Sequence, residues 1–213
     1  VNQGFFLWGM ARTTPGHAAL LYALTPIFVF LLARWRLGEP VTPRKVAGIA
    51  TAFAGVVVVL TGRGALGAGG AEGLLGDLMI LLAVVAWAVF AVGGKVYAER
   101  YGVLAMTGVA ITFGSLAYLP VGLAASDAAA FARLSPAGWA SVAYLVALTS
   151  IAAYLLYYWA MRRAEASRVA VYSNLQPVFT ALLAWALHGE PITAPFLLGG
   201  AMVLAGVVLT ERG

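Results

Sequence analysis

Long runs of apolar residues follow one another along the whole chain, and the breaks between them hold the charges, prolines and most glycines. A charge-free run of about 17 or more residues is long enough to cross the hydrocarbon core of a membrane as a helix. Seven runs are long enough to span: 16–33, 46–62, 78–94, 101–126, 134–161, 169–187 and 191–210. An eighth, shorter run, Val1–Ala11, either lies in the membrane interface or is the end of a longer helix.

Composition supports an all-α integral membrane protein. Hydrophobic residues make up 62% of the chain, charged residues 10%, and the mean hydropathy is +0.93, whereas a soluble domain carries about 25% charged residues. There is no cysteine, which excludes disulfides. No charged segment precedes the first apolar run, so the sequence predicts no signal peptide.

The basic residues set the orientation. The net charge is +5, but the Lys and Arg side chains gather at the ends of the apolar runs rather than in a stripe that would suit nucleic acid. Cytoplasmic connections are enriched in Lys and Arg, which predicts a plasma membrane protein, with bacterial inner membrane as the expected setting and a cytoplasmic C-terminus. Alternate connections carry ten basic residues, Arg34, Arg36, Arg44, Lys45, Lys95, Arg100, Arg162, Arg163, Arg168 and Arg212, against three, Arg12, Arg63 and Arg133.

Part of the chain is repeated. The stretch Ala19–Gly62 returns as Ala170–Gly213 at a constant offset of 151 positions, and the repeated positions include Gly38-Glu39-Pro40 against Gly189-Glu190-Pro191. Because five spans separate the two copies, they cross the membrane in opposite directions. The pattern predicts an inverted repeat, an arrangement typical of transporters.

The repeat also predicts the domain organisation. Residues 1–62 form part of a first repeat, 63–76 a Gly-rich linker and 77–213 a second repeat of five helices. The first-repeat counterpart of the second unit would begin roughly 80 residues before Val1, by the same offset. We therefore expect a complete protein of ten helices in a five-plus-five arrangement, from which about two and a half are lacking here.

These features resemble a known family. Ala18–Phe28, the segment Leu37-Gly38-Glu39-Pro40 and the helix with Gly48 and Gly55 resemble the EamA domain of the drug/metabolite transporter superfamily, and Ala170–Gly213 resembles it again. The resemblance covers essentially the whole chain and is specific for fold rather than substrate. It implies ten helices around a central cavity, alternating access, and export or exchange of small metabolites such as amino acids or of hydrophobic drugs.

Polar residues before two prolines are the first candidates for a substrate site. Pro26 and Pro177 each remove a backbone hydrogen bond and are expected to kink their helices. The side chains just upstream occupy equivalent positions in the two copies and face either a cavity or a neighbouring helix, where such hydrogen bonds are worth about 0.6 kcal/mol. They are Tyr22 with Ser173, Thr25 with Gln176, and Asn174 in the second copy alone.

Two further groups are weaker candidates. Ser150, Tyr154 and Tyr158 recur every four residues and form one polar and aromatic stripe, although tyrosines near Arg162 also suit the aromatic belt at a membrane surface. Trp87 lies in the middle of its run and fits either a cavity wall or helix packing.

Other polar residues have structural interpretations. Glu39 and Glu190 follow helix ends, where a carboxylate can cap the start of the next helix. His17 and His188 are isolated and predict no metal site. The rows formed by Gly48 with Gly55 and by Gly199 with Gly206 predict close helix packing.

The sequence therefore predicts a membrane transporter with a small-molecule substrate, embedded in the lipid bilayer and without cofactor or nucleic acid. Asp, Glu, Lys and Arg are absent from the middle of every run, which favours uncoupled transport or exchange over proton coupling. An enzyme is disfavoured because no nucleophile, paired carboxylate or metal cluster is visible. A truncated, non-transporting membrane protein or scaffold stays as the alternative, and the oligomeric state is not indicated.

Overall fold

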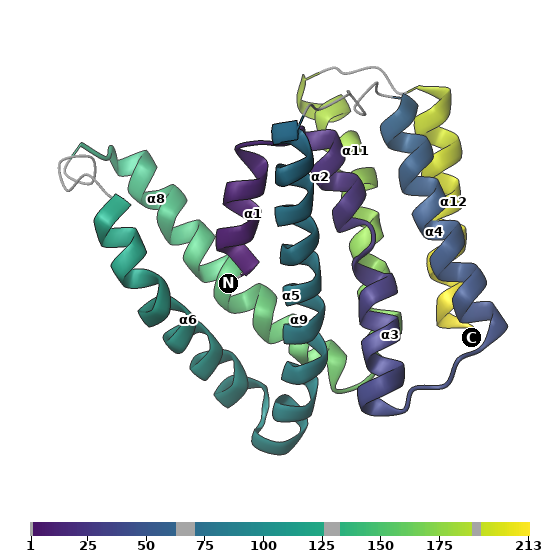
Figure 1. The fold of residues 1–213 in the computed structure, drawn as a ribbon, viewed down its shortest axis with the longest axis horizontal. Helices are drawn as coiled ribbons and strands as arrows, with labels where there is room; N and C mark the ends of the chain where they lie inside the picture. Colours follow the sequence, from purple (N-terminus) through teal and green to yellow (C-terminus); the bar gives the residue numbers. More distant parts are fainter. Residues whose placement is uncertain (1, 63–70, 126–132, 189–192) are drawn as a thin grey trace. The chain divides into compact units, whose positions relative to one another are not determined.

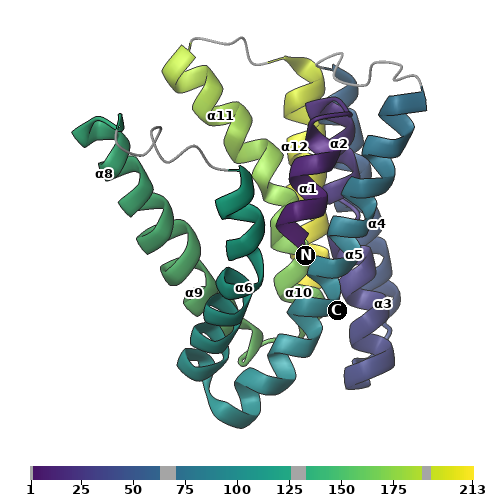
Figure 2. The same cartoon turned by 60° about the vertical axis from the view of Figure 1, so that its left-hand side comes forward.

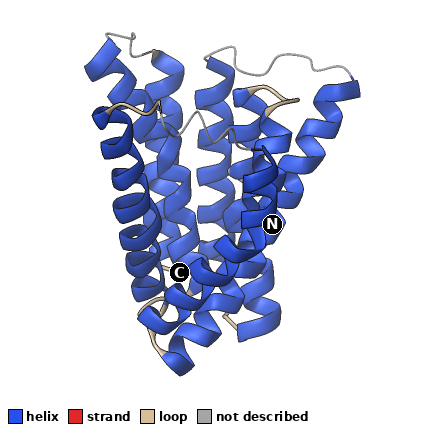
Figure 3. Ribbon diagram, turned by 90° about the vertical axis from the view of Figure 1, so that its left-hand side faces the viewer, coloured by secondary structure: helices blue, strands red, loops and turns tan. Residues whose placement is uncertain are grey.

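The computed structural model describes residues 2–62, 71–125, 133–188 and 193–213 (Figure 1). All regular elements in these ranges are helical (Figure 3). The α-helices are α1 (Asn2–Met10), α2 (Pro15–Tyr22), α3 (Thr25–Leu37), α4 (Pro43–Gly62), α5 (Ala71–Tyr101), α6 (Val103–Ala125), α8 (Pro136–Tyr144), α9 (Ala153–Met161), α10 (Ala166–Val171), α11 (Gln176–His188) and α12 (Ala194–Glu211). A π-helical segment, η1 (Leu145–Ala152), joins α8 to α9, and a 3₁₀ turn, η2 (Tyr172–Leu175), joins α10 to α11.

The predicted all-α membrane fold is confirmed. Within the described residues, seven helical stretches are long and apolar enough to cross a bilayer, and each overlaps one of the seven predicted spans. Three of the stretches are built from more than one element: α2 with α3, α8 with η1 and α9, and α10 with η2 and α11. The stretches are His17–Leu37, Pro43–Thr61, Gly73–Tyr101, Val103–Ala124, Pro136–Met161, Ala166–Leu187 and Ala194–Glu211.

The predicted linker is shorter than the sequence suggested. Residues 63–70 lie outside the described ranges, but α5 begins at Ala71, so residues 71–76 are helical. Gly76 explains the difference, because a Cβ added there would lie 2.7 Å from the backbone nitrogen of Thr13. This glycine allows the start of α5 to pack closely against the turn between α1 and α2.

The chain divides into two compact units, Val1–Val92 with Glu165–Gly213, and Gly93–Ala164. The first unit combines α1–α4 and most of α5 with α10–α12, so it draws on both predicted repeats. One cluster of buried apolar side chains in this unit is formed by α4, α11 and α12, with Val56, Val59, Val178 and Val203 among its members.

In the first unit, α4 packs against α12, its counterpart in the repeat (Figures 1 and 2). A Cβ added at Gly48 would lie 2.7 Å from the carbonyl oxygen of Gly206, and one at Gly206 would lie 2.6 Å from that of Gly48. Gly55 and Gly199 approach each other in the same reciprocal way, at 2.6 and 2.5 Å. The predicted packing role of the four glycines is therefore confirmed.

The same contacts reveal the symmetry. Gly48 and Gly199 are equivalent positions of the two repeats, as are Gly55 and Gly206, and each contacts the non-equivalent glycine of the other helix. Reciprocal contacts of this kind are the signature of a two-fold relation. The two helices are antiparallel, as an inverted repeat requires.

In the second unit, α6 packs against α9, and the end of α5 lies against the ring of Tyr158. The Tyr158 side chain is fully buried, and a Cβ added at Gly94 would collide with its ring. Lys95 Nζ donates to the carbonyl oxygen of Ala164 at 2.5 Å. By contrast α8 buries none of its residues, so its apolar surface suits contact with lipid.

Candidate functional site

Two helices of the first unit are interrupted at equivalent positions. The helix that ends as α2 at Tyr22 resumes as α3 at Thr25, immediately before Pro26. The helix that ends as α10 passes through η2 and resumes as α11 at Gln176, immediately before Pro177. Proline lacks the N–H that would continue the helical ladder, which accounts for a break at the same place in both copies.

Polar side chains at both breaks donate to backbone carbonyl groups. The Thr25 hydroxyl donates to the carbonyl oxygen of Tyr22 at 2.6 Å, which is the acceptor that the missing N–H of Pro26 would have used. At the second break, the Ser173 hydroxyl donates to the carbonyl oxygen of Ala170 at 2.7 Å, three residues earlier. Thr25 is 3% exposed, so its hydroxyl serves the backbone.

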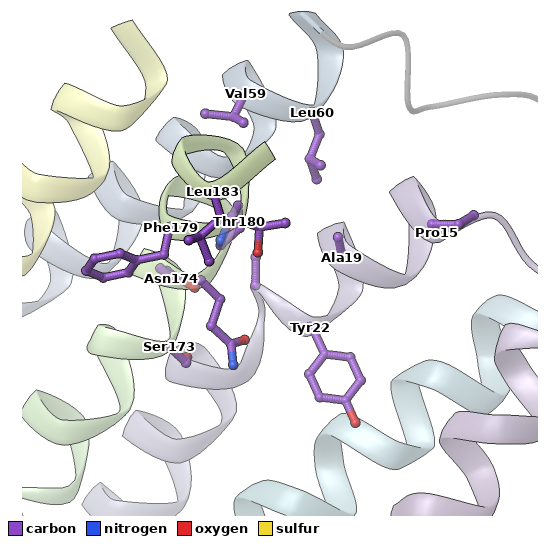
Figure 4. Close-up of a pocket in the computed structure, with 13 residues that line it drawn as sticks. Pro15, Ala19, Tyr22, Val59, Leu60, Ser173, Asn174, Phe179, Thr180 and Leu183 are labelled. Atoms are coloured by element: carbon purple, nitrogen blue, oxygen red, sulfur yellow. The ribbon is translucent and has the colours of Figure 1, made fainter. Parts of the chain in front are cut away.

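A cavity of about 580 Å³ lies beside these breaks (Figure 4). It is bounded by α2, the end of α4, and the segment from η2 into α11. The residues that line it carry no ionisable acid or base: Pro15, Ala19, Tyr22, Ala23, Val59, Leu60, Ser173, Asn174, Gln176, Pro177, Phe179, Thr180 and Leu183, with Tyr22 as the one phenol.

Asn174 is the most unusual group in the lining. It is 1% exposed, and within the described chain neither its Oδ1 nor its Nδ2 has a hydrogen-bond partner. Leaving a buried polar group unpaired costs about 1–3 kcal/mol, and such groups are rare enough in folded proteins to call for an explanation. The residue sits in the 3₁₀ turn, at the interruption itself.

Tyr22 borders the cavity from α2. Its hydroxyl accepts from Asn2 Nδ2 at 3.3 Å, and its ring meets Phe6 edge to face at 5.4 Å between centroids. The Tyr22 side chain is therefore held in place by two residues of α1, Asn2 and Phe6. Gln176, from α11, is exposed at the cavity.

The structure thus brings together four of the predicted site residues, Tyr22, Ser173, Asn174 and Gln176. Trp87 lies elsewhere on α5, with its ring centroid 5.7 Å from that of Phe90.

The remaining candidates, Ser150, Tyr154 and Tyr158, belong to the second unit. There the Ser150 hydroxyl donates to the carbonyl oxygen of Leu145 at 3.2 Å, inside the π-helical segment. A π-helical stretch is itself often found at functional positions, and no pattern in the amino-acid sequence predicted it.

Sequence reasoning missed Thr180 and the apolar wall of the cavity. Thr180 lies one helical turn after Gln176 on α11, so the spacing of four was the available signal. Val59 and Leu60 reach the cavity from α4, and only the packing of that helix places them there.

At the opposite end of α3, Glu39 caps a helix, but not the one expected. Its carboxylate accepts from the backbone N–H groups of Ala166 and Ser167 and, at 2.6 Å, from the Ser167 hydroxyl, so it caps the start of α10. The next helix in sequence, α4, is capped by Thr42, which accepts from the Lys45 N–H at 3.2 Å. The reason is tertiary: α3 packs along α10, which brings the loop after α3 to the start of α10. Glu190 lies outside the described residues.

An ion pair stands beside this cap. Lys45 is fully buried, pairs with the Glu165 carboxylate and donates to the carbonyl oxygen of Pro40 at 3.1 Å. Glu165 also accepts from Arg168 Nε at 3.2 Å. Burial alone would raise the pKa of the Glu165 carboxyl, but the hydrogen bond and charge of Lys45, with Arg168, hold that pKa below its ordinary value.

The two ends of the symmetric arrangement therefore differ. Two segments, α3 and α10, pack against each other, and Glu39 joins them. Their repeat counterparts, α11 and α2, line the cavity instead. Equivalent pairs of helices are thus seen in two arrangements within one unit.

A polar contact also lies near the cavity end. His17 Nδ1 and Asp77 Oδ2 are 2.9 Å apart, and Asp77 also accepts from the Thr13 hydroxyl. Among the described residues, no group of three His, Asp or Glu side chains gathers in a way that could hold a metal ion.

Comparison with known proteins gives the chain a family. The EamA-like transporter family matches residues 1–61 and 74–212. An uncharacterised transporter of Archaeoglobus fulgidus is 34% identical, and the match covers 97% of this chain and 70% of that protein. The uncharacterised transporter YyaM of Bacillus subtilis is 30% identical over 100% of this chain and 68% of its own length.

Two other similarities are informative. A protein of Streptantibioticus cattleyicolor named "Probable terminal-alkyne amino-acid exporter" is 31% identical, over 96% of this chain and 67% of its own. A crystal structure matches the fold with a TM-score of 0.85 at 21% identity, covering 99% of this chain and 73% of the other. The chain belongs to the EamA-like transporter family, and it is a membrane transporter of the drug/metabolite type rather than an enzyme.

Proposed function

We propose that this transporter moves small molecules without net charge, with amino acids as the first candidates, by alternating access between its inverted repeats. The observation that carries the proposal is the different arrangement of equivalent helices. One pair, α3 with α10, is packed and capped, while its counterpart, α11 with α2, borders the cavity. Exchanging the two arrangements would close the cavity and open the opposite end, which is what alternating access needs.

The cavity supports the substrate class. Its lining has no acidic or basic side chain, and Val59, Leu60, Phe179 and Leu183 give it an apolar wall. A polyanion would find no compensating charge there. The relative named as a probable amino-acid exporter agrees with a substrate of this size and polarity.

The orientation of the protein in the membrane is inferred from its basic residues. The capped end of α3 and α10 carries Arg34, Arg36, Lys45 and Arg168, so we propose that it faces the cytoplasm with the C-terminus. With this orientation the cavity end faces outward, and we propose that this arrangement is the outward-open state of an exporter or exchanger in the plasma membrane.

We further propose that transport is uncoupled from protons, because the cavity lining offers no carboxylate or imidazole as a relay. Flux of radiolabelled leucine into proteoliposomes, with and without a pH gradient, tests both parts. We expect saturable flux of similar rate in the two conditions. Flux that vanishes without the gradient would contradict the uncoupled mechanism, and the lack of any flux over empty liposomes would contradict the proposed function, favouring a non-transporting protein.

A further inference from the structure

The structure assigns a specific task to the unpaired amide of Asn174. We propose that it recognises the polar head of the transported molecule, and that this head presents a hydrogen-bond donor and an acceptor side by side. The inference rests on the proposed function and deepens it. It concerns which residue reads the substrate and which way round the substrate lies.

The first support is that the amide is buried and unused. Asn174 is 1% exposed in the lining of the cavity, and both of its polar atoms lack a partner in the described chain. A carboxamide offers two N–H donors and an acceptor oxygen. A group that presents the complementary pair satisfies both atoms at once, whereas a lone hydroxyl or a lone amine leaves one of them unpaired.

The second support is that neighbouring polar groups are already engaged. The Ser173 hydroxyl donates to Ala170, and the Tyr22 hydroxyl accepts from Asn2. Gln176 is exposed, so its amide is not buried as that of Asn174 is. Asn174 is thus the polar group in the lining that gains most from a ligand.

The third support is charge. With no acidic or basic side chain in the lining, a head with net charge would stay uncompensated. A zwitterionic α-amino-acid head avoids this, because its ammonium group donates to Oδ1 while its carboxylate accepts from Nδ2. Hydrogen bonds to charged groups are about twice as strong as neutral ones.

The repeat gives the substrate a direction. The counterpart of Asn174 is Ala23, which is 5% exposed and packs in the apolar cluster with Val56 and Val59. The first repeat therefore offers no amide at the equivalent position, and the proposed contact with the head belongs to the second repeat alone. The apolar tail then lies along the wall formed by Val59, Leu60 and Leu183.

The test measures binding of leucine to the purified protein by calorimetry, beside two analogues of the same carbon skeleton. Isoamylamine lacks the carboxylate, and 4-methylpentanoate lacks the ammonium group. We expect each analogue to bind about 10- to 100-fold more weakly than leucine, since each leaves one amide atom unpaired. Equal binding of either analogue would overturn the inference.

The variant Asn174→Leu, which is similar in size and apolar, should lose the same factor for leucine, so that the preference for leucine over the two analogues shrinks. Its melting temperature without ligand should equal or exceed that of the wild type, because it removes an unsatisfied buried group. Loss of a structural residue would lower the melting temperature without ligand, whereas loss of a binding residue would not. A melting temperature lowered by several degrees would mean that the amide has a structural partner, and would refute the inference.

The matched control is Thr107→Val. Thr107 is 2% exposed, its hydroxyl is also unpaired in the described chain, and it belongs to the second unit. This change should leave leucine binding unaltered. Leucine flux in proteoliposomes distinguishes failure of the proposed role of Asn174 from failure of the proposed function. Normal flux through Asn174→Leu contradicts the role of the amide alone, whereas absent flux in the wild type contradicts the proposed function.

Discussion

The two ends of the first unit are built from equivalent helices but are held by different contacts. One end, where α3 packs against α10, is called the closed end. There the start of α10 has no cap of its own, and Glu39 supplies one from the loop after α3. At the cavity end, the start of α2 is capped locally, since the Thr14 hydroxyl accepts from the His17 N–H at 3.2 Å. A cap from another segment ties two helices together, whereas a local cap leaves its helix independent.

The sequence of the two repeats explains why the two ends are held by different contacts. Ser167 and Ala166, which donate to Glu39, correspond to Gly16 and Pro15 in the first repeat. Glycine has no hydroxyl, and proline has no backbone N–H. Buried Lys45 corresponds to Phe196, so the ion pair is also confined to one end. The closed end therefore has polar contacts that its counterpart cannot reproduce.

The largest expected effect on stability is at the contact between α4 and α12, because this contact runs along both ends of the unit. Gly199→Leu would force a side chain against the backbone of Gly55, where even a Cβ lies 2.5 Å from the carbonyl oxygen. We expect a loss of about 3 kcal/mol or more of stability, at the upper end of overpacking costs. Thermal unfolding in detergent measures it.

The matched control is Gly108→Leu on α6, where an added Cβ meets nothing within 4 Å. It should change the melting temperature little. Equal effects of the two substitutions would contradict the close packing of α4 and α12.

A cross-link at the closed end should stop transport. The chain contains no cysteine, so Glu39→Cys with Ser167→Cys places one reactive pair across the cap. A short bifunctional maleimide should abolish leucine flux in this double variant, because α10 can no longer leave α3. The single variant Glu39→Cys with the same reagent is the control and should keep its residual flux. Undiminished flux in the cross-linked protein would show that this end does not open.

Removing the cap without a cross-link should have a smaller, opposite effect. Glu39→Ala leaves two N–H groups and one hydroxyl at the start of α10 without their acceptor, at a cost of about 1–3 kcal/mol. Labelling of Ser167→Cys should become faster in the Glu39→Ala background. Glu39→Gln keeps one acceptor oxygen and should fall between wild type and alanine; the reverse order would rule out the capping role.

The ion pair should make the closed end sensitive to acid. The pKa of Glu165 is lowered in the folded protein, so its stabilising effect is present above the ordinary carboxyl value of about 4.3 and is lost as the pH falls through the folded pKa. We expect the melting temperature to decline below about pH 4.5, and to decline less in Glu165→Gln. Parallel curves for the two proteins would exclude this contribution.

The smallest effect concerns the cavity wall. Thr180 is exposed there and corresponds to buried Val29 in the first repeat. Thr180→Val makes the two repeats alike at this position and removes a hydrated hydroxyl, so leucine flux should change less than about twofold. A change as large as that of Asn174→Leu would mean that the head of the substrate reaches Thr180.

Much of the fold could be predicted because it depends on patterns of residues that are close together in the sequence. Apolar run lengths predicted the spans, and the repeated glycines predicted the α4–α12 contact. The site was predicted in part: the prolines marked both helix breaks, and residues beside Pro177 line the cavity. The target of Glu39 and the hydroxyl bond of Thr25 could not be predicted in this way, because they depend on which segments meet in three dimensions.

The most direct test is a pair of distance measurements by electron spin resonance on the cysteine-free chain. One label pair, at Arg36 and Arg168, reports the packed end, and the other, at Pro15 and Leu187, reports the end beside the cavity. Adding leucine should lengthen the first distance while it shortens the second. Two distances that change in the same direction, or that both stay fixed while flux proceeds, would contradict the account.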